Sequence, residues 1–282
     1  MSSFFSGIRQ KFRRRLVYGL LSLLVAFGLV VSTPQPSPAI PWGELILRGV
    51  QVIQLSNISD EQEVELGKQI NDQLTSQEVK IYGNRGIQQY INEIGQRLAQ
   101  ESDRPGIPYT FQVVEDSNIN AFATMGGFVY VTTGLMRAAD NEAQLASVMG
   151  HEIGHIVARH SVEQLRERTV RGGLLSAAGL DRSTLANIAV ELTLNRPNSR
   201  SDEYEADELG LTNIVRVGYA PSASVAFLEK LLNQGSVPTF LSTHPATNDR
   251  IERLQALVDE SSQNSGGGMD SAAYRSRTSV LR

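Results

Sequence analysis

Apolar residues recur at intervals of three and four over much of the chain, which predicts a largely helical protein. The first such stretch, residues 59–77, opens with Ser59 and Gln62, the spacing of a capping box at a helix N-terminus. In the second stretch, one stripe of apolar side chains is formed by Ile87, Tyr90, Ile91, Ile94 and Leu98. We therefore expect two amphipathic helices near the start of the folded region.

A single region has the alternating pattern of strands instead. Residues 109–114 alternate, and after a turn the segments 120–123 and 128–132 are rich in the Val, Tyr, Phe and Thr that strands favour. This pattern predicts a small sheet of about three strands. Because helical patterns resume afterwards, the expected fold class is α+β, mainly helical with a small β-sheet.

Residues 141–160 form the most apolar of the later helical stretches, and a helix that is apolar on several faces belongs in the middle of a domain. A further helix is expected over residues 201–217, ended by Gly218, and Pro221 is expected to open the next. Residues 172–194 are largely small and apolar, but charged residues interrupt them. We expect a pair of packed helices there rather than a membrane span.

Two glycines, Gly150 and Gly154, lie inside the predicted central helix over residues 141–160. Each costs about 0.5–1 kcal/mol relative to alanine in a helix. We hypothesise that they allow the edge strand or a neighbouring helix to approach closely.

The ends of the chain differ in composition from the rest. Basic residues up to Arg15 precede sixteen uncharged residues, 16–31, and a stretch of small residues and prolines follows, which is the pattern of a signal peptide. A retained anchor is the alternative, and either places the body in the periplasm or an equivalent extracytoplasmic compartment. The expected organisation is a signal peptide or N-terminal anchor (1–39), a linker (40–58), a catalytic domain (59–260) and a disordered tail (261–282).

Composition narrows the chemistry. The 282 residues include no cysteine, which excludes disulfides, thiolate zinc sites and a cysteine nucleophile, so any metal must be held by nitrogen and oxygen. Beyond the basic N-terminal stretch the chain carries 21 basic and 30 acidic residues. Because nucleic-acid binding depends on Lys and Arg, this balance argues against a nucleic-acid partner.

Three of the four histidines lie within ten residues of one another in the predicted central helix. His151 and His155 are four residues apart, so both rings project from one helix face and can bind one zinc ion. Glu152 is placed to act as general base on a zinc-bound water. Such polar groups in an apolar helix need a partner such as a metal, and the pattern HExxH is a zinc-hydrolase motif.

A zinc hydrolase needs a third protein ligand. His160 lies about 140° around the helix from His155, which excludes it unless the helix breaks, and we expect it to stabilise the helix C-terminus. Glu203 and Asp207 are again four residues apart, so Glu203 can ligate zinc while Asp207 accepts the free ring N–H of a ligand histidine. The same residues also fit an acidic first turn favoured by the helix dipole, and that interpretation stays open.

The combination of His151-Glu152-x-x-His155 with Glu203-x-x-Ala206-Asp207, 48 residues after His155, resembles the gluzincin peptidases. This family includes the CAAX prenyl proteases, HtpX-like proteases and bacterial outer-membrane quality-control peptidases. The resemblance implies a zincin fold with one Zn²⁺ per chain. It implies that the zinc ligands are His151, His155 and Glu203. It also implies that the catalytic base is Glu152 and that the supporting residue is Asp207.

The same resemblance assigns further site residues. It implies that the edge strand that binds the substrate backbone contains Asn120, Ala121, Phe122 and Ala123. It also implies that His244 approaches the zinc, where it either stabilises the oxyanion or blocks the open coordination position. Arg250, in the helix that follows, is a further candidate.

The expected function is that of a zinc metalloendopeptidase acting in quality control on misfolded or misassembled envelope proteins, in a peripheral membrane or envelope assembly complex. Two alternatives stay open. One is a chaperone or assembly factor with a structural zinc, for which Glu152 would be unnecessary. The other is a latent protease blocked by His244.

Overall fold

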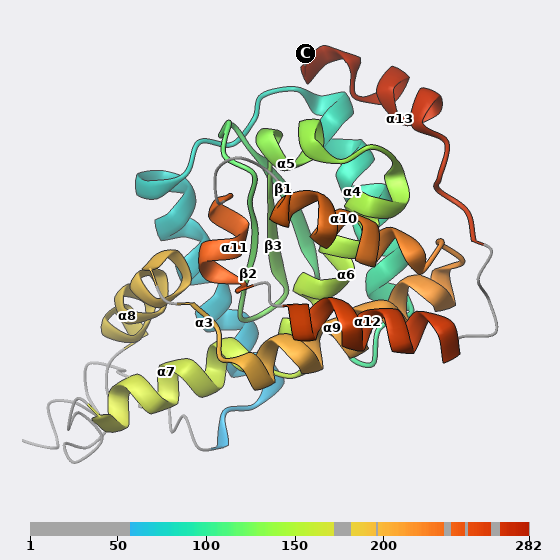
Figure 1. Ribbon diagram of the computed structural model, residues 1–282. Coiled ribbons are helices and arrows are strands. Elements are labelled where there is room, and N and C mark those ends of the chain that lie inside the picture. The colour runs from blue at the N-terminus through green and yellow to red at the C-terminus, as the bar shows by residue number, and fades with distance from the viewer. Residues whose placement is uncertain are drawn as a thin grey trace, which may run out of the picture. The chain divides into compact units, whose positions relative to one another are not determined.

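The structure is a computed structural model that describes residues 57–171, 182–195, 197–233, 238–245, 248–260 and 266–281. These residues form many helices around one small sheet, which confirms the α+β fold class (Figure 1). The predicted signal peptide or anchor and nearly all of the predicted linker lie outside the described residues. None of the described helices is both long and apolar enough to cross a membrane.

The sheet has three strands, as the alternating pattern predicts. They are β1 (Thr110–Val114), β2 (Ala121–Thr124) and β3 (Phe128–Thr132), in the order β1-β3-β2. Strand β3 runs parallel to β1 and antiparallel to β2, which leaves β2 at an edge. Gly126 and Gly127 make the turn between β2 and β3 with φ angles of 78° and 95°, a region open to glycine.

The first two helices match the amphipathic patterns. Helix α3 (Asp60–Gln73) begins with the predicted capping box, in which Ser59 and Gln62 each satisfy the other's backbone N–H. Helix α4 (Arg85–Gln100) buries its apolar stripe against β1 and the central helix. Further described elements are η2 (Leu74–Glu78), α5 (Thr133–Ala138), α8 (Arg182–Asn195) and α10 (Ser222–Leu232).

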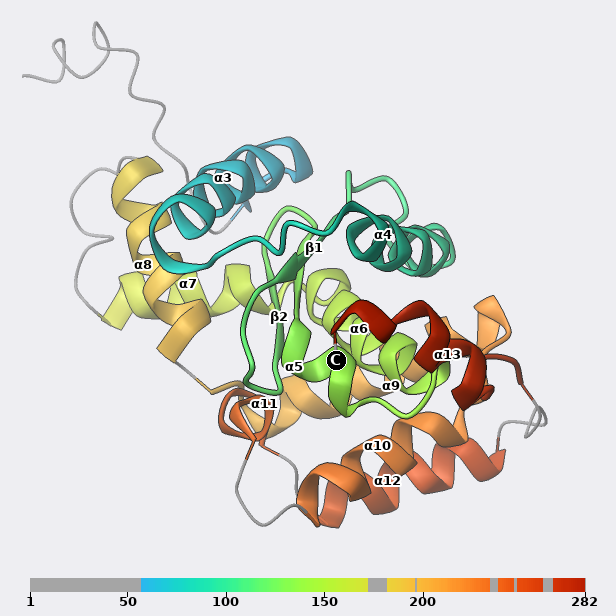
Figure 2. The ribbon, with the colours of Figure 1, turned by 90° about the horizontal axis from the view of Figure 1, so that it is seen from above.

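The central helix is α6 (Glu142–Val157), and all its residues from Ala143 to Ile156 are buried. Helix α9 (Arg200–Val217) packs along it, and α6 also contacts β2, β3 and α10 (Figure 2). A Cβ atom at Gly154 would lie 2.7 Å from the Ala206 carbonyl oxygen of α9. The hypothesis of close approach is thus confirmed, and the neighbour that approaches is α9.

The central helix ends three residues earlier than the sequence pattern predicts. Helix α6 ends at Val157, and α7 (His160–Arg171) begins at His160 after Arg159, whose φ is 61°. The Arg159 guanidinium contacts the Glu63 carboxylate at 3.0 Å and donates to the Ile58 carbonyl. These contacts with Glu63 of α3 and with Ile58, which precedes that helix, hold a backbone conformation that is rare for an arginine. The prediction that His160 stabilises the C-terminus of the central helix is therefore wrong, because His160 opens the next helix.

The C-terminal residues 266–281 are ordered, so the prediction of a disordered tail is wrong for this part. They contain α13 (Ser271–Arg277) and η4 (Ser279–Leu281). The Tyr274 side chain is buried and its hydroxyl donates to the Met136 carbonyl, while Leu281 is buried as well. Two apolar anchors seven residues apart fix the segment, and so sparse a pattern gives no detectable periodicity in the sequence.

Candidate metal centre

Four buried side chains converge beside α6. His151 and His155 come from α6, Glu203 comes from the first turn of α9, and His244 directly follows α11 (Thr239–Thr243). Each offers one ligand atom, and these four atoms lie within 4.8 Å of one another. The Nε2 atoms of the two α6 histidines are 3.1 Å apart. The Glu203 carboxylate lies 3.5 Å from Nε2 of His151 and 3.4 Å from Nε2 of His155.

The local sequence explains why these groups meet. The spacing of four residues puts both histidines on the α6 face that packs against α9. Helix α9 begins at a capping box made by Ser199 and Asp202, so the next residue, Glu203, enters the helix interface. Glu203 is only 1% exposed. A carboxylate placed solely to complement the helix dipole would lie at the surface, so the acidic-first-turn interpretation does not explain Glu203.

Asp207 and Arg250 support the ligand groups from behind. Asp207 Oδ1 lies 2.9 Å from Nδ1 of His151, the ring nitrogen turned away from the cluster. Arg250, on α12 (Asn248–Glu260), donates from Nε and Nη2 to the two Asp207 oxygens at 2.8 and 2.7 Å, and from Nη1 to Glu203. Arg250 is only 2% exposed, so its guanidinium is buried within the site. A bidentate pair of this kind fixes the Asp207 carboxylate and, through it, the His151 ring.

The electrostatics of the cluster favour a cation between its ligand atoms. Burial raises the pKa of Glu203, but the charge on His244 and hydrogen bonds from the histidines outweigh it and keep the pKa far below its usual range. Burial lowers the pKa of His151, but Asp207 and Glu203 outweigh it and raise the pKa to about 10. Burial lowers the pKa of His155 to about 3, which leaves its lone pair free to ligate. The donor set of two imidazoles and a carboxylate suits zinc.

Glu152 lies beside this cluster and has a different environment. Its carboxylate is 1% exposed, and neither oxygen has a hydrogen-bond partner among the described residues. The side-chain atom His244 Nε2 is 3.4 Å from Oε1. Burial raises the pKa of Glu152, against the opposing charges of His244 and His151. A buried carboxylate that has this 3.4 Å contact but accepts no hydrogen bond among the described residues is costly, so its presence here points to a partner that arrives with the ligand or substrate.

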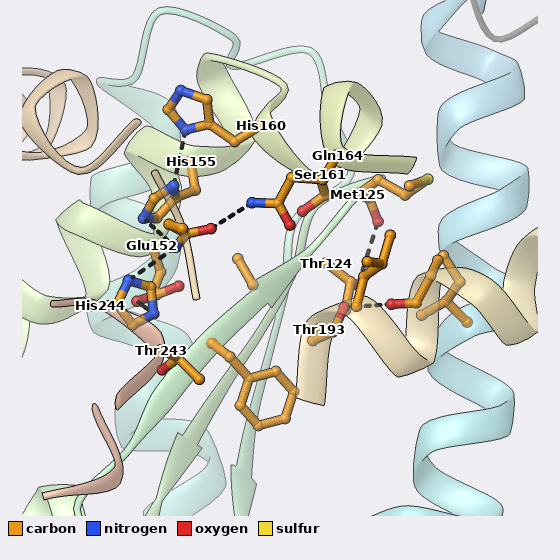
Figure 3. A pocket seen from close by; sticks show the side chains of 16 residues that line it. Thr124, Met125, Glu152, His155, His160, Ser161, Gln164, Thr193, Thr243 and His244 are labelled. Carbon is orange, nitrogen blue, oxygen red and sulfur yellow. Dashed lines mark hydrogen bonds and ion pairs between the residues drawn. The ribbon is translucent and has the colours of Figure 1, made fainter. Parts of the chain in front are cut away.

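A cleft lined by Glu152, His155 and His244 opens beside the cluster (Figure 3). One wall is formed by Phe122, Ala123 and Thr124 of the edge strand. Thr132 donates its backbone N–H to the Asn120 carbonyl, so these two residues are a hydrogen-bonded pair of the antiparallel ladder. Hydrogen-bonded and non-hydrogen-bonded pairs alternate from there along β2 and β3. By that alternation Asn120 and Phe122 bond to β3, whereas the backbone groups of Ala121 and Ala123 face the free edge. The cleft is also lined by Ala189, Leu192 and Thr193 of α8, and by Ser161 and Gln164 of α7.

Two further residues near the cluster are not among the predicted site residues. Asn198 Nδ2 lies 3.3 Å from Nε2 of His155 and 3.2 Å from Nδ1 of His244. His160 Nδ1 lies 2.8 Å from Nδ1 of His155. No sequence pattern singles out Asn198. The spacing of His155 and His160 would indicate a contact between the two rings only if the helix break at Arg159 were known.

Comparison with known proteins agrees with this geometry. The family model described as peptidase family M48 matches residues 87–258, more than half of the chain. The chain belongs to peptidase family M48. Its relatives include the beta-barrel assembly-enhancing protease of Escherichia coli (strain K12), 30% identical over 274 residues, which cover 89% of this chain and 55% of that protein. They also include the mitochondrial metalloendopeptidase OMA1 of Arabidopsis thaliana, 33% identical over 206 residues, 70% of this chain and 42% of that protein.

Membership of M48 confirms the predicted family and identifies zinc as the metal for this donor set. The chain spans about half the length of these curated relatives. The relatives also correct one prediction. Mitochondrial OMA1 proteins of a plant and two yeasts match most of the chain, which contradicts the assignment to the periplasm or a similar extracytoplasmic compartment.

Proposed function

We propose that the chain is a zinc metalloendopeptidase in which His151, His155 and Glu203 hold the metal and Glu152 is the general base. The observation that carries this proposal is the buried Glu152 carboxylate, which accepts no hydrogen bond among the described residues and lines the cleft together with His155, His244 and the edge strand. A structural zinc site needs only its ligands and does not need a general base such as the Glu152 carboxylate. When bound, zinc acts as a Lewis acid that polarises the scissile carbonyl and lowers the pKa of a water to about 7.

The chain's own residues supply the remaining steps. Glu152 accepts a proton from the attacking water and carries it to the departing amine nitrogen, a transfer favoured by its raised pKa. The substrate pairs with the free edge of β2 through the backbone of Ala121 and Ala123, with Asn120 and Phe122 holding that strand to β3. Asp207 and Arg250 keep the His151 ring and the Glu203 carboxylate in place.

The binding mode defines the substrate class. A segment can add to the edge of β2 only when it is extended and has free backbone groups. Native domains rarely expose such segments, whereas unfolded or unassembled polypeptides do. We therefore propose a role in protein quality control, and the relative named beta-barrel assembly-enhancing protease supports a link to assembly. The substrates are polypeptides that have failed to fold or to assemble.

Removing the metal tests the proposed activity. We expect the full-length chain to lose cleavage of a reduced and alkylated unfolded protein after dialysis against a chelator, and to regain it when one equivalent of zinc is added. The measurement is the appearance of fragments on gels and by mass spectrometry. Prevention of aggregation without fragments, with or without zinc, would instead support the chaperone alternative and contradict a peptidase.

The position of His244 favours a second candidate, a latent form of the same enzyme. Its Nδ1 lies 3.1 Å from Glu203 and 3.3 Å from Nε2 of His151, inside the ligand cluster. A histidine in that place occupies the position that a catalytic zinc site keeps open. Under this proposal a His244→Ala variant cleaves faster than the wild type in initial-rate assays. A slower variant would contradict latency and support oxyanion stabilisation by His244.

A further inference from the structure

His155 uses both of its ring nitrogens. Its Nε2 faces the ligand cluster, 3.4 Å from Glu203, and its Nδ1 lies 2.8 Å from Nδ1 of His160 (Figure 3). Because Nε2 must present a lone pair to a metal, the ring proton belongs on Nδ1. His155 therefore donates to His160, whose Nδ1 is the acceptor.

The acceptor is itself held from its other side. With Nδ1 accepting, His160 carries its proton on Nε2, which lies 3.3 Å from Oε2 of Glu205 and 4.0 Å from Oδ1 of Asp202. The order of contacts therefore runs from His155 to His160 and then to the carboxylates on α9. His151 is held differently, since its outward nitrogen meets the Asp207 carboxylate directly. The two α6 histidines thus have separate supports.

The break between α6 and α7 creates this arrangement. In a continuous helix His160 would point about 140° away from His155. The φ of 61° at Arg159 turns the chain, and Glu63 on α3 holds the Arg159 side chain there. Glu63 is 0% exposed and is also bound by Arg104 at 3.0 Å, so the turn is anchored in the core.

Helix stability does not account for a histidine at this position. His160 is the first residue of α7, and the positive end of the helix dipole disfavours a cation there. The side chain is 7% exposed and contributes a polar atom to a buried contact. His160 instead directs one unprotonated ring nitrogen at the His155 ring, and such an acceptor is what holds a metal-ligating histidine in a fixed orientation.

We propose that His160 is a positioning residue that fixes the tautomer and ring orientation of His155, so that Nε2 of His155 faces the metal. The proposal rests on the zinc site and does not require that the chain cleave peptides. Outer supports of metal ligands typically contribute about 10–100-fold in metal affinity.

Two substitutions of equal shape separate this role from packing. Asn places its carbonyl oxygen where Nδ1 of His160 lies, whereas Leu fills the same volume without an acceptor. We expect His160→Leu to bind zinc about 10–100-fold more weakly than the wild type, and His160→Asn to recover most of that affinity. The measurement is competition of each full-length protein with a chromophoric zinc chelator, with the absorption spectrum of the cobalt-loaded protein as a second report on ligand geometry.

The outcomes are distinct. Leu and Asn variants with the wild-type zinc affinity would overturn the proposal. Equal losses in both would also overturn it, because the acceptor would then be irrelevant. Thermal unfolding of the chelator-treated proteins is the control for packing, and we expect the two variants to match each other there. A wild-type chain that binds zinc without cleaving a polypeptide would refute the proposed function and leave this comparison unchanged.

Discussion

A Glu152→Gln variant is expected to bind zinc as the wild type does and to cleave an unfolded polypeptide about 10²–10⁴-fold more slowly. Glu152 is absent from the group of ligand atoms, so its replacement leaves the donor set intact. Glutamine has nearly the same shape but accepts no proton at neutral pH. The buried position of Glu152 also keeps bulk water from replacing it as a base. We would measure the zinc content of each protein by atomic emission and its initial cleavage rate on the same samples.

The matched control for this variant is Glu208→Gln, which makes the same chemical change at an exposed position on α9. We expect it to retain both zinc and activity. Turnover in Glu152→Gln equal to that of the control would contradict the role of Glu152 as base. Loss of zinc in Glu152→Gln would show that the carboxylate belongs to the metal site instead.

A Glu203→Gln variant is expected to lose more than about 100-fold in zinc affinity, because loss of an outer support alone costs about 10–100-fold. Glu203 supplies the carboxylate among the four clustered groups. Its replacement also removes a carboxylate that lies against the Arg250 guanidinium. The measurement is a zinc competition titration, supported by thermal unfolding with and without zinc. Zinc at 100 times its Kd stabilises a protein by about 2.7 kcal/mol, and this gain should disappear in the variant.

Glu208→Gln again serves as the control for Glu203→Gln, since both residues lie on α9 and only Glu203 is buried. We expect the control to bind zinc with the wild-type affinity. If Glu203→Gln retained that affinity, Glu203 would not be a ligand. The third ligand would then have to be His244, the remaining member of the cluster.

Local patterns predicted those parts of the fold that depend on neighbours in the sequence. Ser59 and Gln62 satisfy each other's backbone groups within one turn, so the start of α3 is evident from the sequence. The strand pattern marked the sheet because alternation follows directly from which face is buried. The spacing of His151 and His155 predicted a shared face for the same reason, since it depends only on helix geometry.

Features that depend on distant residues could not be predicted. The break at Arg159 is held by Glu63, which lies 96 positions earlier in the chain, and no local signal marks it. The order in residues 266–281 depends on the contacts of Tyr274 and Leu281 with other parts of the chain. His244 and Arg250 were placed near the metal only through the resemblance to gluzincins. The packing of α12 against α9 then explains how Arg250 reaches the site.

The central claim is that this chain hydrolyses peptide bonds, and hydrolysis transfers one oxygen atom of water to each new carboxyl terminus. The most direct measurement is therefore digestion of a reduced and alkylated unfolded protein in ¹⁸O-labelled water by the zinc-loaded chain, followed by mass spectrometry of the fragments. Glu152→Gln, loaded equally with zinc, serves as the background. We predict fragments whose new carboxyl termini carry ¹⁸O with the wild type and almost none with the variant. An intact substrate with both proteins, or equal fragments from both, would contradict the account.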